Sequence, residues 1–465
     1  MHLNIIATSI SYLLLGFCST IVAGEKVHRG LESVREGNHL KEALHVDFGD
    51  VECPSKIMDI VQRMPKLRTL VVAGPLYIDQ HIEELVKIDS LRFLVLDSTG
   101  VSDKKIAEIR KARPELVVYQ SQRWAIRKIG KLAYGIMIDD RLSNDHPDLR
   151  KLLGDQYFME VTRVDFGRLP DIEMGPWERI PNEQLAPLRM LPTLTYLDLS
   201  WTRLDDCGMR YLEGLTRLEK LSIPLEEVSV EGLAPIRGMP RLKLFTGEMS
   251  DTKAKHLAGL RKLEFLNIGS PKLTDVGLKY LRDLKRLEYL RLNDSSIHGD
   301  GLRHLCELPR LESLFLDNSQ LEDLTWVSRM SSLEHLSIDG TKIDDANVAH
   351  LAKLPNLRSL SLNDTQVSDA ALAHLKKIPK LREIYLNYTK ISNAGLRQIQ
   401  EFANLEHLSI YGIVNDEEGI AILENFTNLN TLYFDLLIPG RDNYEKELLY
   451  DRIRKALPNC KINHY

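Results

Sequence analysis

The hexapeptide Leu-Glu-His-Leu-Ser-Ile at residues 333–338 carries the pattern that decides the fold. Five consecutive segments follow the pattern L-x-x-[LI]-x-[LIF], and they begin at Leu333, Leu357, Leu381, Leu405 and Leu429. The starts are 24 residues apart, and each unit holds one short apolar triplet of the kind that forms a β-strand. A fixed period of this length predicts a solenoid, in which stacked units bury a core that no unit can bury alone.

The same pattern extends toward the N-terminus with interruptions. A first block has units that begin at Ala43, Leu67, Leu91 and Leu116. A second block opens at Val161 and continues at Leu194, Leu218, Leu242, Leu263, Leu287 and Leu311. Between the blocks the period is lost, and the composition predicts a helix at 124–132 and a short strand at 136–138.

The ends of the two blocks resemble each other. The segment I-R-K-A-R-P at residues 109–114 recurs as I-R-K-A-L-P at 453–458. Terminal units of solenoids differ from interior ones because one of their faces has no neighbour, so two such units indicate two arrays. The predicted organisation is an N-terminal repeat block at 25–120, an irregular connector or cap at 121–160, and a main array with a C-terminal cap at 161–465. The connector either caps the second block or joins the two sheets into one continuous or nearly continuous arc, and we favour the arc.

Residues 1–24 differ from the rest of the chain. No charged residue lies between Ile5 and Val22, an apolar run spans 10–17, and the small residues Ala23 and Gly24 precede the first charges. This arrangement is typical of a secretory signal peptide that is cut after Gly24. The alternatives are an uncleaved membrane anchor and, because of Cys18, a lipoprotein signal.

Composition excludes several classes of function. The hydrophobic content of 43% and charged content of 27% are those of a folded soluble protein, and a net charge of −5 gives no reason to expect a nucleic acid partner. Beyond Cys18, four scattered cysteines lack the spacing of zinc ligands: Cys53, Cys207, Cys306 and Cys460. No H-E-x-x-H, G-x-S-x-G or phosphate-binding glycine loop occurs. The sequence therefore predicts no enzyme activity, no cofactor and no metal.

The second half of each unit is predicted to be a helix, as at 274–281 and 368–375. Acidic or amide residues at one register are expected to cap these helices: Asp206, Asp275, Asp345, Asp369 and Asn393. A column of hydroxyl side chains is expected to bond backbone groups of the adjoining coil: Thr99, Thr202, Ser295, Ser319, Thr341, Thr365 and Thr389.

The combined pattern L-x-x-L-x-L-x-x-T-x-[IV]-[ST]-D-x-[GA]-L-x-x-L resembles the leucine-rich repeat family. Its units are similar to those of the ribonuclease-inhibitor-like and F-box-associated branches and of uncharacterised secreted bacterial members. The resemblance covers almost all of the chain after residue 24. It implies an α/β fold, a right-handed leucine-rich repeat solenoid or horseshoe with parallel strands on the concave face and helices on the convex face. It implies a way of binding other molecules, but no particular reaction or ligand.

Tyrosines at outward strand positions are the first candidate binding site. We expect Tyr385, Tyr411 and Tyr433 on three neighbouring strands, with Tyr388 at the rim and the rings about 5 Å apart. Such rings anchor many protein interfaces. The alternative is that tyrosine merely suits a half-exposed strand. A second, weaker candidate consists of Tyr289, Arg291 and Phe315.

A column of Asp and Asn side chains runs beside the tyrosines: Asn293, Asp317, Asp339, Asn363 and Asn387. As a site, these oxygens suit a cationic protein surface, the hydroxyls of a sugar, or calcium. Calcium is disfavoured because it needs six or more converging oxygens. The structural interpretation is that each residue forms a local turn that ends its strand, and we favour it.

Two other patterns are explained by the repeat itself. Sequons begin at Asn293, Asn363 and Asn387 on the repeat's turn and at Asn425 elsewhere. His304, His350 and His374 share one register on the helical side, where surface histidines are expected more than a metal pair.

These features predict a secreted, periplasmic or cell-surface protein that binds a protein partner through its concave face. Carbohydrate recognition at a cell surface is the first alternative. An intracellular ligase or effector adaptor is the second, and it requires that residues 1–24 are not a signal peptide.

Overall fold

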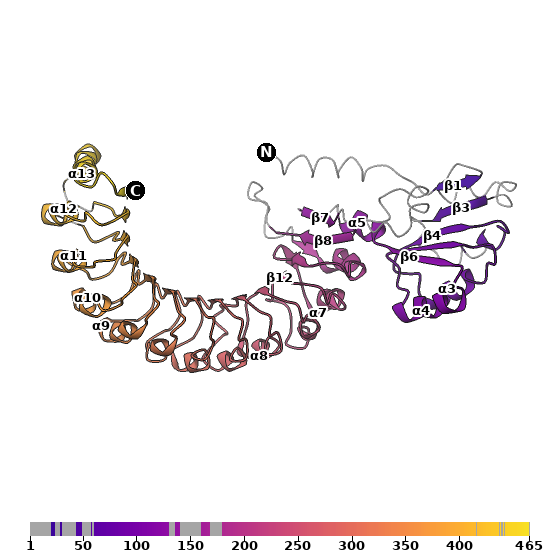
Figure 1. Ribbon diagram of the computed structural model, residues 1–465, viewed down its shortest axis with the longest axis horizontal. Coiled ribbons are helices and arrows are strands. Elements are labelled where there is room, and N and C mark those ends of the chain that lie inside the picture. The colour runs from indigo at the N-terminus through magenta and orange to yellow at the C-terminus, as the bar shows by residue number, and fades with distance from the viewer. Residues whose placement is uncertain are drawn as a thin grey trace. The chain divides into compact units, whose positions relative to one another are not determined.

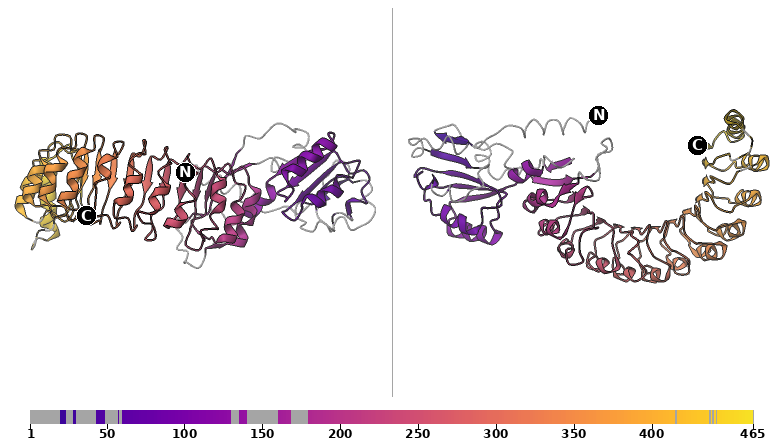
Figure 2. Two further views of the ribbon diagram at one scale, coloured as in Figure 1. Left: turned by 90° about the horizontal axis from the view of Figure 1, so that it is seen from below. Right: turned by 180° about the vertical axis from the view of Figure 1, so that it is seen from behind.

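The structure is a computed structural model, and it describes residues 20–23, 28–29, 43–48, 57, 60–129, 135–139, 160–167, 179–414, 416–436, 438, 440 and 442–464. The chain forms two compact units, residues 1–228 and 229–465, and each is described by itself. Figures 1 and 2 show their elements from three sides.

The first repeat block forms a six-stranded sheet in residues 1–228. Its strands in order are β1 (Thr20–Ala23), β2 (His28–Arg29), β3 (Ala43–Phe48), β4 (Thr69–Ala73), β5 (Phe93–Asp97) and β6 (Val117–Ser121). Strands β3 to β6 are parallel, and each residue pairs with the residue 24 positions later. Helices α3 (Asp79–Leu85) and α4 (Asp103–Ala112) connect them. The inward side chains, such as Leu70 and Leu94, are fully buried, so the predicted period is confirmed.

The connector supplies the first strand of a second sheet. After α5 (Arg123–Ile129), strand β7 (Gly135–Asp139) pairs antiparallel with β8 (Glu160–Asp165). Strands β10 (Tyr196–Asp198) and β12 (Lys220–Ser222) continue in parallel. A small pair, β9 (Ile180–Pro181) and β11 (Thr202–Arg203), accompanies the helical segments η4 (Asn182–Met190), α7 (Asp206–Met209) and η5 (Arg210–Leu212). The six strands of the first block belong to a separate sheet.

Residues 229–465 form a parallel sheet of short strands in chain order. The strands are β13 (Leu244–Thr246), β14 (Phe265–Asn267), β15 (Tyr289–Arg291), β16 (Ser313–Phe315), β17 (His335–Ser337), β18 (Ser359–Ser361), β19 (Glu383–Tyr385), β20 (His407–Ser409), β21 (Thr431–Tyr433) and β22 (Lys461–Asn463). The strands line the inner side of this unit and the helices line its outer side (Figure 1). We call the inner side the concave face.

The helical segments of this unit change in type along the chain. The early repeats have short turns, most of them 3₁₀: η6 (Ala234–Gly238), α8 (Asp251–Ala254), η7 (Gly277–Tyr280), η8 (Asp300–His304) and η9 (Val327–Arg329). The later ones are mostly α-helices: α9 (Asp345–Val348), η10 (Ala349–Lys353), α10 (Asp369–Leu375), α11 (Asn393–Ile399), α12 (Glu417–Leu423) and the terminal α13 (Asn443–Ala456). Helix α13 and strand β22 are the last elements of this unit, and β22 pairs with β21.

The predicted helix caps are one residue out of place. Helix α10 is capped by Ser368, whose side chain accepts the Ala370 N–H, and α9 is capped by Asp344. Asp345 instead accepts the backbone N–H and the hydroxyl of Ser368 in the next repeat, both at 2.7 Å. Asp369 likewise accepts the backbone N–H of Ser392 in the next repeat at 2.8 Å, so both residues join neighbouring repeats because the residue before each already serves as the cap.

The hydroxyl column behaves as predicted at Thr202, Thr341, Thr365 and Thr389, whereas the buried hydroxyls of Ser295 and Ser319 have no hydrogen-bond partner among the described residues. The hydroxyls of Thr341, Thr365 and Thr389 each donate to the carbonyl three residues earlier at 2.6 Å. These bonds close the turn that follows each strand.

Candidate functional site

The first and third residues of the strands line the concave face of residues 229–465, and all of them except the buried Ser409 are at least partly exposed. The middle residues, for example Leu290, Leu314 and Leu336, are buried in the core. The parallel register aligns equivalent positions of successive repeats into columns. The third-residue column contains Arg291, Phe315, Ser337, Ser361, Tyr385, Ser409 and Tyr433.

The predicted stack of three tyrosines is not assembled. Tyr385 and Tyr433 share the third-residue column, but Ser409 of β20 lies between them. Tyr411 lies beyond the end of β20, where its backbone N–H donates to Asn387 Oδ1 at 2.7 Å. The expectation was wrong because Tyr411 follows the last inward residue of its unit, whereas Tyr385 and Tyr433 precede theirs. Burial raises the pKa of Tyr385, and Glu383 and Tyr433 raise it further. A role of these tyrosines in binding stays a prediction.

Tyr388 lies at the rim with 59% of its surface exposed and a left-handed φ of 55°. Other repeats place residues that tolerate this conformation at the same register: Asp294, Asn318, Gly340, Asp364 and Gly412. The ring lies against Gly412, where an added Cβ would be 2.5 Å from Tyr388 Cδ1. Strained backbone at an exposed aromatic residue is a mark of functional positions, so Tyr388 stays a candidate.

The Asp and Asn column forms a hydrogen-bond ladder between repeats. Asp317 Oδ1 accepts the Asp339 N–H at 3.1 Å, Asp339 Oδ1 accepts the Asn363 N–H at 2.9 Å, and Asn363 Oδ1 accepts the Asn387 N–H at 2.8 Å. Each side chain thus holds the next strand end instead of forming the predicted local turn. The predicted local turn is therefore wrong, and the side chains bond the backbone of the next repeat instead. Half-buried and hydrogen-bonded, these oxygens are less available to a ligand than the sequence suggested.

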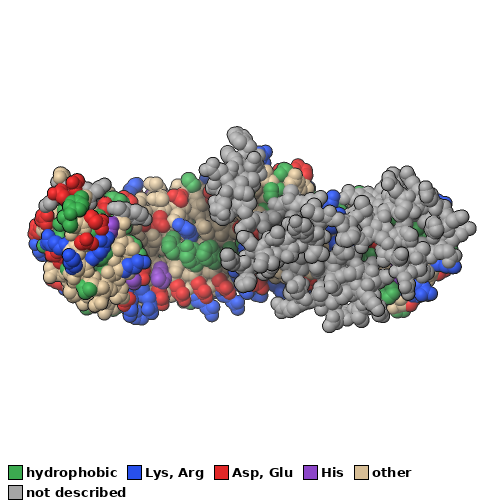
Figure 3. All heavy atoms as spheres, turned by 90° about the horizontal axis from the view of Figure 1, so that it is seen from above, with side chains coloured by type: hydrophobic (Ala, Val, Ile, Leu, Met, Phe, Trp, Pro, Cys, Tyr) green, Lys and Arg blue, Asp and Glu red, His purple; other side chains and the backbone are tan. Residues whose placement is uncertain are grey.

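A ladder of three aromatic rings is the main apolar feature of the concave face, and we call it the ring ladder. Phe265 and Tyr289 stack with their centroids 4.2 Å apart and their planes 10° apart. Tyr289 and Phe315 follow at 4.8 Å and 33°. The Arg291 guanidinium lies 5.9 Å from the Phe315 centroid. Figure 3 shows hydrophobic side chains gathered here on the inner side of the strands.

The ring ladder contains residues of the weaker of the two candidate binding sites that the sequence predicted. The sequence pointed to Tyr289, Arg291 and Phe315 but missed Phe265, which has the same place in its unit as Tyr289. Comparing the first outward residue of successive units would have found it, since Phe265 and Tyr289 are directly paired in the register.

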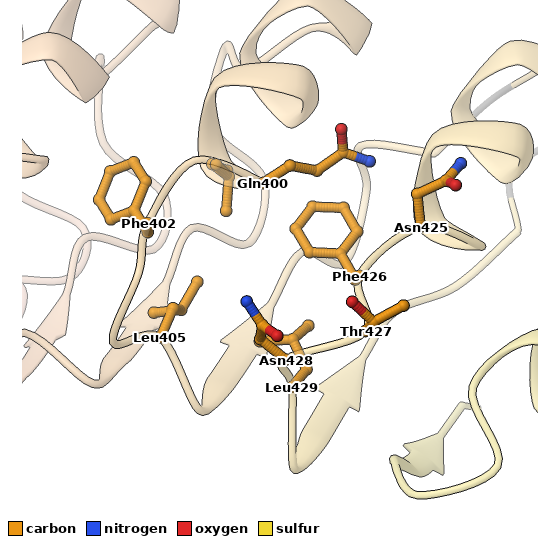
Figure 4. A pocket seen from close by; sticks show the side chains of 9 residues that line it. Gln400, Phe402, Leu405, Asn425, Phe426, Thr427, Asn428 and Leu429 are labelled. Carbon is orange, nitrogen blue, oxygen red and sulfur yellow. The ribbon is translucent and has the colours of Figure 1, made fainter.

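The outer side of the unit holds a small cavity of about 70 Å³ between two repeats. Phe402, Phe426 and leucines form its walls, and the amides of Gln400, Asn425 and Asn428 surround it (Figure 4). Its volume suits a few water molecules and no larger ligand. Asn425 of the fourth sequon donates from Nδ2 to the Ala421 carbonyl at 2.8 Å.

The described residues contain neither a metal site nor a helix that could span a membrane. No group of three or more His, Cys, Asp or Glu side chains converges there as metal ligands would. The helices described in the structure include none that is long and apolar enough to cross a membrane. The N-terminal apolar run lies almost wholly outside these residues.

Comparison with known proteins points to one family. Residues 179–396 match the sequence profile of the leucine-rich repeat region family. No curated protein sequence matches the chain significantly. Among solved structures, the chain is similar to an internalin (InlF) from Listeria monocytogenes, at 18% identity over 72% of this chain and 92% of that chain, with a TM-score of 0.43.

Two other structures are similar. A leucine-rich repeat protein from Leptospira interrogans is 18% identical over 87% of this chain and 92% of that chain, with a TM-score of 0.43. The plant peptide hormone receptor RGFR1, solved in complex with RGF2, is 15% identical over 54% of this chain and 45% of that chain, with a TM-score of 0.37. The profile match over residues 179–396 and the repeated strand-and-helix units together identify a leucine-rich repeat solenoid, a scaffold of the kind that binds other proteins.

Proposed function

We propose that this leucine-rich repeat protein is secreted or periplasmic and binds a protein partner through the concave face of residues 229–465, without catalysing a reaction. The observation that carries the proposal is the ring ladder of Phe265, Tyr289 and Phe315. Large aromatic side chains are enriched among the residues that dominate interface energies. The strands beneath them are joined by backbone and side-chain ladders, so the surface is preformed and loses little order when a partner binds.

A triple variant tests the role of the ring ladder. Phe265→Ser/Tyr289→Ser/Phe315→Ser removes the rings and leaves the inward neighbours Leu266, Leu290 and Leu314 in place. We expect an unchanged circular dichroism spectrum and loss of the partner that wild-type protein captures by photo-crosslinking from its own host. The partner is identified by mass spectrometry.

A matched variant on the same face separates the two aromatic candidates. Tyr385→Ser/Tyr411→Ser/Tyr433→Ser removes three rings outside the ring ladder, and we expect it to keep the partner. If both variants capture the same proteins as wild type, the concave-face proposal fails. If only the tyrosine variant loses the partner, the partner binds at Tyr385, Tyr411 and Tyr433 and not at the ring ladder.

Secretion rests on the apolar run in residues 1–24. Cleavage after Gly24 would remove β1 (Thr20–Ala23), which pairs with β2 and β3. The mature sheet would then begin at β2. Mass spectrometry of the protein from its host should find an N-terminus at Glu25. An intact Met1 on a cytoplasmic protein would refute secretion and favour an intracellular adaptor.

A further inference from the structure

A row of glutamates borders the ring ladder on one side. Glu264, Glu288, Glu312 and Glu334 occupy the same position in four consecutive repeats, one residue before the first residue of β14 to β17. Figure 3 shows acidic side chains in a row along one edge of the hydrophobic patch. The row covers the three repeats of the rings and the repeat that follows them. In the next two repeats the position is taken by Arg358 and Arg382.

Only two of the four glutamates in this row lie within ion-pair distance of an arginine in the described part of the chain. Arg310 lies 3.6 Å from Glu288, and Arg358 lies 3.0 Å from Glu334. Glu264 and Glu312 make no ion pair with any residue in the described part of the chain. Arg291, the cation of the patch, lies on the third-residue column, on the other side of Tyr289 from the glutamates. The patch therefore has an acidic edge with two carboxylates free to meet a cation.

From this arrangement we infer that the occupant of the ring ladder is a basic segment of a protein partner, with an apolar side chain flanked by lysine or arginine. This inference rests on the proposed function and names the chemistry of its partner. The apolar side chain packs on the ring edges, and the basic side chains face Glu264 and Glu312. Complementary charge raises the rate of association and sets the orientation of the bound segment.

The packing of the rings argues against a sugar at this place. A sugar ring stacks on the open face of an aromatic ring. Phe265 and Tyr289 cover each other's inner faces at 4.2 Å, and Tyr289 and Phe315 approach at 4.8 Å, so mainly edges are presented. An acidic segment is disfavoured as well, because its carboxylates would meet the unpaired glutamates.

Selection from a random peptide library displayed on phage tests the inference. The full-length protein after its natural processing is the bait, and phage that also bind the ring-ladder triple variant are discarded. We expect enriched peptides to combine an aromatic or aliphatic residue with an excess of Lys and Arg. Synthetic versions should bind Glu264→Gln/Glu312→Gln about tenfold more weakly than wild type at low salt, and the difference should shrink at high salt.

The control removes the same charge elsewhere. Glu307→Gln/Glu401→Gln neutralises two exposed glutamates in the connections outside the concave strands, and it should bind the peptides as wild type does. Enriched peptides that need the rings but carry no excess of Lys and Arg, or that bind both double variants equally, would overturn the inference and leave the proposed function standing. Absence of any ring-dependent peptide would overturn both.

Discussion

Asn363 clamps Asp339 across the boundary between two repeats. Its backbone N–H donates to Asp339 Oδ1 at 2.9 Å and its Nδ2 donates to Oδ2 at 2.8 Å. Each β-strand here is only three residues long, so few ladder bonds hold one unit to the next. The clamp adds two hydrogen bonds to these few ladder bonds. Solenoid stability is a sum of unit and interface terms, and this clamp belongs to the interface term.

Asp339→Ala should weaken this boundary. The substitution leaves two half-buried donors of Asn363 without their acceptor, which costs about 1–3 kcal/mol. We expect a lower urea midpoint, and faster hydrogen exchange in peptides covering residues 333–363. Asp339→Asn keeps an oxygen for the Asn363 N–H, as Asn363 does for the Asn387 N–H at 2.8 Å, but loses the acceptor of Asn363 Nδ2, so it should lose less stability than Asp339→Ala. Equal stability of Asp339→Ala and wild type would show that the clamp contributes nothing.

Tyr388→Asn should stabilise the protein. A non-glycine residue in the left-handed region costs about 1–2 kcal/mol, and asparagine tolerates it better than tyrosine does. The gain is reduced by loss of the contact between the ring and Gly412. We therefore expect the free energy of unfolding in urea to rise by about 1 kcal/mol. Tyr444→Asn, which removes an exposed ring from helix α13, should give no such gain.

Gly412→Ala provides a second arm of this prediction. The added methyl would collide with the Tyr388 ring, and φ at Gly412 is +79°, so the variant should be less stable than wild type. In Tyr388→Asn/Gly412→Ala the collision is removed and the backbone strain remains. The double variant should therefore be more stable than the sum of the two single effects predicts. Strict additivity of the two changes would disprove the contact.

The leucine period gave the fold because inward positions admit only apolar side chains. The same logic fails for the polar columns. Asp345 looks like a local cap in the sequence, and only the packing of neighbouring repeats joins it to Ser368. Outward residues are not constrained by the core, so Tyr411 was misplaced and Phe265 was overlooked. Binding chemistry depends on which outward side chains the register brings together, and a period alone does not say that.

His256 should make stability depend on pH. The side chain is 4% exposed, and burial lowers the pKa of the imidazole, with Arg237 and Lys255 lowering it further. In the unfolded chain histidine titrates near pH 6.5. Below that pH the unfolded chain binds the proton more readily, so the free energy of unfolding falls by up to about 1.4 kcal/mol per pH unit. The loss ends once the pH falls below the folded-state pKa.

His256→Gln should flatten this part of the pH profile. Urea midpoints measured between pH 5 and pH 8 give the comparison, and His335→Gln at an exposed strand position is the control. A profile for His256→Gln that matches wild type would show that the buried imidazole does not titrate with unfolding.

Asp97 should make the stability of the first repeat block fall as the pH rises, which is the opposite of the effect of His256. It lies at the end of β5, fully buried, and its Oδ1 accepts the Trp124 N–H of α5 at 2.9 Å. Nearby, Arg123 lies 3.5 Å from Asp47, so one guanidinium faces two carboxylates. Burial raises the pKa of Asp97 to about 6, and the Asp47 charge contributes to the rise.

The direction of this pH dependence follows from comparing the proton affinity of Asp97 in the folded and unfolded chain. In the unfolded chain aspartate titrates near pH 3.9, so between about pH 4 and pH 6 the folded block binds the proton more tightly. Its free energy of unfolding therefore falls as the pH rises through this window, by about 3 kcal/mol in total. Asp97→Asn keeps an oxygen for the Trp124 N–H and never carries the charge. It should be more stable than wild type at pH 7.5 and should lose that advantage at pH 4.

Urea titrations at each pH, followed by a deuterium pulse at one common pH, measure this block separately through peptides covering residues 93–129. Asp89→Asn, at an exposed position of the same block, should leave the profile unchanged. A stability difference between Asp97→Asn and wild type that does not grow with pH in this window would mean that Asp97 is charged in the folded protein. In that case Arg123 stabilises both carboxylates despite their burial, and α5 is held to the sheet by charge instead of by a protonated acid.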